Sequence, residues 1–154
     1  MGLFGPSKGT AESAIKFMNQ FLSDFDLNPA VCLVQNDQDW AVWELQRGSA
    51  PLLVMVFKNP SFPYIKVLSP IVKMPEEDQV APLLNYCMVK NNNCLATIAL
   101  DADSDIVVKS ERPIEGLDKE ELEMMMHCVS GVADELDNEL AEKFGCEMIG
   151  KDPS

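Results

Sequence analysis

Two apolar runs, Cys94-Leu-Ala-Thr-Ile-Ala-Leu100 and Ile106-Val-Val-Lys-Ser-Glu-Arg112, lie on either side of the acidic segment Asp101-Ala-Asp-Ser-Asp105. The second run begins with β-branched residues, and the segment between the runs consists of turn-forming residue types. Pro113 has no backbone N–H to donate to a neighbouring strand, so the second run should end there. The pattern predicts a β-hairpin.

A long amphipathic helix is predicted directly after this hairpin. Asp118 is suited to the N-cap position, and Glu121, three residues later, completes a capping box. Apolar residues then recur at steps of three and four as far as Phe144, acidic residues fill other positions, and Gly145 suits the left-handed conformation that ends a helix. Met124 lies beside the apolar stripe and widens it, so it is an outlying candidate for partner contact.

The chain before the hairpin predicts two further helices and a set of strands. A broad apolar face follows the capping residue Thr10, and Pro75-Glu-Glu-Asp78 opens a second helix with acidic residues in its first turn. Strands are expected at 40–45, 52–57 and 64–72, with a possible extra strand at 31–34. The connections among these strands are too short for βαβ crossovers. We therefore expect an α+β fold, with an antiparallel β-sheet and three helices in the order α-β-β-β-α-β-β-α.

Length and composition predict one cytoplasmic domain. The 154 residues, 47% of them hydrophobic, suffice for one packed core at 10–145, between a flexible arm at 1–9 and a C-terminal tail at 146–154. The sequence contains neither an apolar run long enough to span a bilayer nor a secretory signal pattern. Its five cysteines form no CxxC pair, which is typical of reduced thiols.

The net charge excludes some partners. A charge of −13 opposes binding to nucleic-acid phosphates and to anionic membranes, because association would begin with like-charge repulsion. The same acidity would attract basic segments of other proteins. Nucleic acid and membrane are therefore not expected as partners, whereas a protein or peptide client is.

The segment Leu52-Leu-Val-Met-Val-Phe57 is apolar at every position, so both faces of the predicted strand need cover. Burying one such side chain fully is worth on the order of 1.5–3 kcal/mol, so a wet face would be costly. The chain's own helices, a second subunit of a homodimer or a client segment would supply the cover. The predicted contact residues are Trp43, Leu53, Met55 and Phe57, with Met124 outlying.

Two alternatives concern chemistry. Asp101, Asp103 and Asp105 resemble the start of a calcium loop, but the loop's sixth position needs glycine and has Ile106, and its twelfth needs glutamate and has Arg112. We favour a plain solvated turn over a metal-dependent hydrolase, and no cofactor is predicted. The other alternative is a regulatory module that binds a small ligand between sheet and helices.

The order of elements, together with Leu83-Leu-Asn85 and Arg112-Pro-Ile-Glu-Gly-Leu-Asp118, resembles the YbjN-like family, which shares the fold of the class I type III secretion chaperones. The similarity covers roughly residues 12 to 144. It implies an α-β-β-β-α-β-β-α domain, commonly dimeric, that binds protein segments rather than turning over a substrate. We therefore expect a non-enzymatic, chaperone-like binding module that acts as a homodimer.

Overall fold

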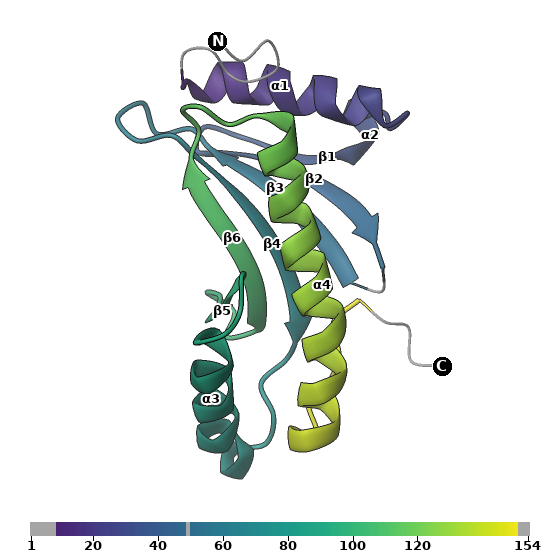
Figure 1. Cartoon of the computed structure of the whole chain (residues 1–154), viewed down its shortest axis with the longest axis vertical. Coiled ribbons are helices and arrows are strands. Elements are labelled where there is room, and N and C mark those ends of the chain that lie inside the picture. Colours follow the sequence, from purple (N-terminus) through teal and green to yellow (C-terminus); the bar gives the residue numbers. More distant parts are fainter. Residues whose placement is uncertain (1–8, 49, 151–154) are drawn as a thin grey trace. The chain divides into compact units, whose positions relative to one another are not determined.

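The computed structural model describes residues 9–48 and 50–150 (Figure 1). Its helices are α1 (Ala11–Asp24), α2 (Pro29–Cys32), α3 (Glu77–Asn91) and α4 (Lys119–Phe144). Its strands are β1 (Leu33–Asn36), β2 (Trp40–Arg47), β3 (Ala50–Phe57), β4 (Tyr64–Val72), β5 (Thr97–Leu100) and β6 (Ile106–Pro113). The strands form an open antiparallel sheet in the order β1-β2-β3-β4-β6-β5. The predicted α+β class is confirmed, and most of the predicted N-terminal arm lies outside the described residues.

The extra strand exists, but it begins two residues later than predicted and follows a short helix. The side-chain oxygen of Asn28 accepts a hydrogen bond from the backbone N–H of Ala30 at 3.0 Å, and Pro29 occupies the first turn of α2. A capping asparagine followed by proline is a strong signal for a helix start. Helix α2 thus takes up Val31, and the fold contains this fourth helix in addition to the three predicted.

The hairpin and the capping box form as the sequence indicates. Strands β5 and β6 pair in antiparallel register from Thr97↔Lys109 to Leu100↔Ile106. At the start of α4, the carboxylate of Asp118 accepts a hydrogen bond from the backbone N–H of Glu121 at 2.8 Å. The carboxylate of Glu121 in turn accepts one from the backbone N–H of Asp118 at 3.2 Å. This reciprocal pair fixes where α4 begins.

The chain packs as two compact units. Within the described residues, unit 1 contains residues up to Leu45, Leu53–Val67 and Glu111–Met126. Unit 2 contains Gln46–Leu52, Leu68–Ser110 and the residues from His127 onward. Strands β2, β3, β4 and β6 and helix α4 contribute residues to both units.

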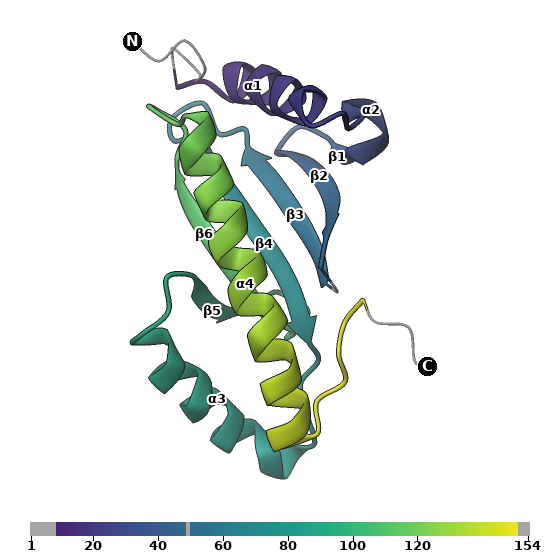
Figure 2. The same cartoon turned by 45° about the vertical axis from the view of Figure 1, so that its right-hand side comes forward.

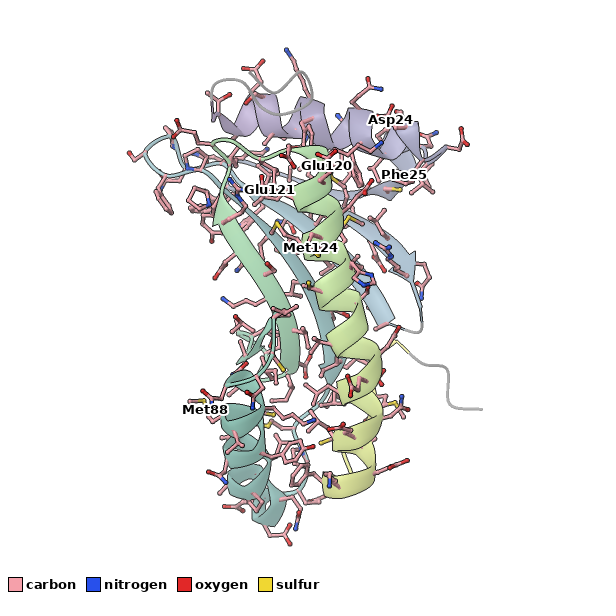
Figure 3. The ribbon with its side chains drawn as sticks, viewed as in Figure 1. Asp24, Phe25, Met88, Glu120, Glu121 and Met124 are labelled. Carbon is pink, nitrogen blue, oxygen red and sulfur yellow. The ribbon has the colours of Figure 1, made fainter. Side chains whose placement is uncertain are left out.

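Unit 1 has its core between α1, the first turns of α4 and one face of the sheet. The indole N–H of Trp43 on β2 donates a hydrogen bond to the side-chain oxygen of Asn19 on α1 at 3.2 Å, so this face of β2 lies against α1. The ammonium of Lys119 lies 5.1 Å from the ring centroid of Phe25, which brings the start of α4 to the end of α1. Figure 3 shows Phe25 and Glu120 at this junction.

Hydrogen bonds in unit 2 join the end of α3 to β5 and the C-terminal residues to β4. The side-chain amide of Asn91 at the end of α3 accepts a hydrogen bond from the backbone N–H of Ile98 at 2.7 Å and donates one to its carbonyl at 3.0 Å. The described part of the predicted C-terminal tail pairs with the end of β4, since Met148 forms a β-bridge with Val72. The backbone N–H of Ile149 donates to the carbonyl of Ile71 at 2.9 Å.

Candidate protein-binding site

Strand β3 is covered on one face and only partly covered on the other. In unit 1, Val54 and Val56 are both 0% exposed, whereas Leu53, Met55 and Phe57 between them are partly exposed. Side chains alternate between the two faces of a strand, so these three lie on one face. The chain buries one side of the apolar strand and leaves the other in partial contact with solvent.

Four aromatic side chains extend this partly exposed face. Trp40 and Tyr64 lie 4.8 Å and 5.0 Å, centroid to centroid, from the ring of Phe57, and Phe62 lies 6.5 Å from Tyr64. We call Trp40, Phe57, Phe62 and Tyr64 the aromatic cluster. Phe62 is 61% exposed. Offset and tilted ring contacts at these distances stabilise a rigid, apolar surface.

The charges around the aromatic cluster are paired. The ammonium of Lys66 lies 5.7 Å from the Trp40 ring centroid and forms a salt bridge with Glu111 at 3.4 Å. Arg112 forms an ion pair with Glu121 at the start of α4. A pocket of about 370 Å³ opens here, lined by Phe62, Tyr64, Glu111, Arg112 and Pro113. The surface is therefore apolar, with two ion pairs and a hollow at its edge.

The structure separates two of the expected contact residues from the others. Trp43 is 0% exposed and lies on the α1 side of β2, opposite the face of Trp40. Met124 is 59% exposed but projects from the first turns of α4 (Figure 3), on the helix side of the sheet. The structure therefore brings together Leu53, Met55 and Phe57 alone.

The sequence alone gives little indication that Trp40, Phe62 and Tyr64 belong to this surface. Trp40 and Tyr64 lie at the edges of predicted strands, where an aromatic residue is most often part of the core. Phe62 stands in the loop Asn59-Pro-Ser-Phe-Pro63, and only its aromatic type sets it apart from its neighbours. Strand pairing brings these side chains together, so their proximity cannot be predicted from any one segment.

The acidic turn does not gather a metal site. The carboxylate of Asp101 accepts hydrogen bonds from the backbone N–H groups of Asp103 and Asp105, both at 2.9 Å. Burial, and secondarily the charge of Asp101, raise the pKa of Asp105. Across residues 9–48 and 50–150, no three or more His, Cys, Asp or Glu side chains are arranged to hold a metal ion. In the same ranges, no helix is both long and apolar enough to cross a bilayer.

Solved structures share this fold. A chain of the HopA1–SchA chaperone–effector complex matches with a TM-score of 0.58 and 12% identity, covering 84% of this chain and 95% of that one. A chain of the ExsC–ExsE complex matches with a TM-score of 0.60 and 11% identity, covering 90% and 96%. YbjN from E. coli matches with a TM-score of 0.53 and 13% identity, covering 88% and 95%.

Sequence comparison gives the family. No curated protein matches the chain at a significant level. The family model described as "T3SS (YopN, CesT) and YbjN peptide-binding chaperone 1" matches residues 19–151. The match contains every strand and the C-terminal part of α1, and the resemblance noted in the sequence is confirmed. The chain therefore belongs to this family of type III secretion and YbjN peptide-binding chaperones.

Proposed function

We propose that this protein binds an apolar segment of a client protein on the surface formed by Leu53, Met55, Phe57 and the aromatic cluster. The observation that carries the proposal is the alternation along β3, where one face is fully buried and the other, equally apolar, stays partly exposed. Covering such a face with apolar side chains is favourable, and contiguous apolar patches on a protein surface mark interaction sites.

The charges at this surface indicate what a client would offer. Lys66 and Arg112 already have carboxylate partners, so neither of them is free to select an acidic client. Selection would rest on shape and apolar contact, with one client side chain entering the pocket beside Phe62.

The fold relatives support a client of this kind. Two of them were solved with a bound partner protein, one of them as a chaperone–effector complex. The family description names peptide binding. We propose that this protein likewise acts by binding, without catalysing a reaction on its client. Free cysteines at all five positions are typical of a reducing compartment and support a place in the cytoplasm.

The working form is, in this proposal, a homodimer. Strand β1 lies at the edge of the sheet, and Val34 on it is 56% exposed, next to Val31 at 76%. An edge strand presents unpaired backbone groups that a second copy can pair with. Sedimentation equilibrium should give twice the monomer mass for the native chain and the monomer mass for Val34→Lys. A wild-type protein that stays monomeric at high concentration would rule this out.

The client surface is tested with the double variant Leu53→Thr/Met55→Thr. Threonine favours strands and has a smaller side chain than leucine or methionine. The fold should therefore persist while the surface loses apolar contact with the client. A fluorescent peptide selected from a random library on the wild-type protein should bind this variant at least about tenfold more weakly, a loss of about 1.4 kcal/mol.

The matched control is Leu27→Thr, which makes the same kind of change on an exposed residue of unit 1 outside both the client surface and the proposed dimer contact. Its affinity for the peptide should equal that of the wild type. Urea midpoints of both variants check that the fold is intact. If the double variant and the wild type bound every selected peptide with equal affinity, the proposal would be contradicted.

A further inference from the structure

The pocket beside the aromatic cluster lies close to the point where the described part of the chain begins. Gly9 is the first described residue, and a Cβ built on it would lie 3.2 Å from the Cβ of Glu115. Figures 1 and 2 show the start of α1 beside the connection between β6 and α4, which contains Glu115. Residues 1–8 therefore join the fold at this connection.

The same connection is bonded to a wall of the pocket. The guanidinium of Arg112 donates hydrogen bonds to the carbonyl of Pro113 at 3.0 Å and to the carbonyl of Glu115 at 2.8 Å. The pocket of about 370 Å³ is lined by residues of β4, β6 and the loop before β4: Phe62, Tyr64, Glu111, Arg112 and Pro113. One side chain, that of Arg112, thus links the residue that Gly9 contacts to the pocket.

The backbone of Gly9 fixes where residues 1–8 leave the surface. Its φ is +57°, in the left-handed region that glycine tolerates and other residues rarely adopt. A side chain at this position would also crowd Glu115. The close approach of Gly9 to Glu115 therefore requires glycine, and the preceding residues start from a defined place beside the pocket.

The chemistry of residues 1–8 matches this surroundings. The segment is Met1-Gly-Leu-Phe-Gly-Pro-Ser-Lys8. Leu3 and Phe4 are apolar, as is the lining of the pocket contributed by its aromatic residues. Lys8 is the only charged residue of the segment and directly precedes Gly9, which places it next to Glu115. Its positive charge is opposite in sign to the net charge of −13 of the whole chain.

The pocket is within reach of Phe4, which stands five residues before Gly9. An extended chain spans at most about 3.3–3.6 Å per residue, so the Cα of Phe4 can lie up to about 17 Å from that of Gly9. Arg112, which lines the pocket, is bonded to the residue that Gly9 contacts. Phe4 can therefore enter the pocket without any change in the described fold.

We propose that residues 1–8 fold back onto the client surface of their own chain, with the Phe4 ring in the pocket against Phe62 and Tyr64, and compete there with a client. The inference rests on the proposed client surface. Aromatic rings in contact stabilise such docking beyond the area they bury. A short tether also gives an effective concentration on the order of mM, so a weak contact suffices to populate the docked state. Docking then lowers the apparent affinity for a client.

Phe4→Ala tests the docking without any client. Two-dimensional NMR of the isotope-labelled, full-length protein compares the backbone amide signals of this variant with those of the wild type. The signals of Phe62, Tyr64 and Arg112 should shift in the variant. In the wild type, nuclear Overhauser contacts should join the Phe4 ring to the rings of Phe62 and Tyr64. Ser7→Ala, a change to the same residue within the same segment, is the matched control and should leave these signals in place.

Competition is tested with a labelled peptide selected from a random library on the wild-type protein. The peptide chosen is one that the variant Leu53→Thr/Met55→Thr binds more weakly, so that it reports on the client surface. Phe4→Ala and a chain that lacks residues 2–8 should each bind it at least about threefold more tightly than the wild type. Ser7→Ala should bind it with the affinity of the wild type.

Three results would overturn the inference. One is that Phe4→Ala shifts only the signals of residues before Thr10. Another is that the wild type, Phe4→Ala and the shortened chain bind the peptide with equal affinity. A third is that the shifts depend on protein concentration, which would place the segment on a neighbouring copy. Failure of the proposed function differs from all three: no selected peptide would depend on Leu53 and Met55, while the NMR contacts of Phe4 would remain and support the docking.

Discussion

At the scale of single residues, the group formed by Tyr86, Lys90 and Glu139 couples stability to pH. The hydroxyl of Tyr86 donates a hydrogen bond to the carboxylate of Glu139 at 2.5 Å, and the ammonium of Lys90 lies 3.1 Å from the same carboxylate. Glu139 has a pKa below its ordinary 4.5, so its contribution is present above that pH and lost as pH falls through the lowered value. Tyr86 and Lys90 have pKa values above their ordinary 10.0 and 10.5, so their contributions are present below those values and lost as pH rises. The group stabilises unit 2 across the neutral range.

Tyr86→Phe should therefore lower the free energy of unfolding at neutral pH and much less in acid. We expect a loss of about 0.5–1 kcal/mol, because a hydrogen bond to a charged group is strong but this one is partly exposed to water. Urea unfolding across an acid-to-neutral pH series measures it. The difference between the two proteins should shrink as Glu139 becomes protonated, and a difference that stays constant with pH would contradict this origin.

At the scale of elements, most of the helices and strands that depend on local residues could be predicted from the sequence. The hairpin at β5 and β6 and the start of α4 depend on turn residues and on the reciprocal cap of Asp118 and Glu121, which are three residues apart. Helix α2 was not predicted, because the apolar residues after Pro29 also suit a strand. Asn28 and Pro29 are nevertheless a local signal for the start of a helix.

The candidate sites show where such local reasoning ends. Apolar residues at every position of β3 led to the prediction that both faces need cover, and the chain itself buries one face fully and the other in part. The choice of Trp43 as a contact residue depended on which face of β2 it occupies, and that is set by the packing of Asn19 against it. A pocket of unit 2 is lined by residues of α3 and α4, which are far apart in the chain. Within one segment of sequence, its clearest sign is Gly131 in the middle of a predicted helix.

At the scale of the whole molecule, charge determines how partners approach. The net charge is −13, and the cations Lys66, Lys73, Lys90 and Arg112 are each paired with a glutamate. Acidic residues outnumber basic ones by 25 to 12, so the electrostatic field around the protein is negative. Such a field accelerates the arrival of cationic partners and acts over about 10 Å at moderate salt.

Basic peptides should therefore associate with this protein more slowly as salt is raised. Their dissociation rates should change much less, because long-range steering acts on encounter more than on the formed complex. Uncharged apolar peptides should show little salt dependence in either rate. Stopped-flow fluorescence over a range of ionic strength separates the two cases, and equal salt dependence for both groups of peptide would contradict this account.

The cysteines divide by accessibility in a useful way. Cys87 and Cys146 are 5% and 7% exposed, and burial raises the pKa of both thiols, that of Cys87 to about 11. Cys32, Cys94 and Cys128 are partly exposed, and Cys94 and Cys128 line a pocket of unit 2 beside α3. The thiolate is the reactive form of cysteine. An alkylating dye added to the native protein should therefore label Cys94 and Cys128 well before Cys87 and Cys146. Cys94 and Cys128 are thus natural attachment sites for a fluorescent dye. A molecule that binds beside them would quench or shield the dye.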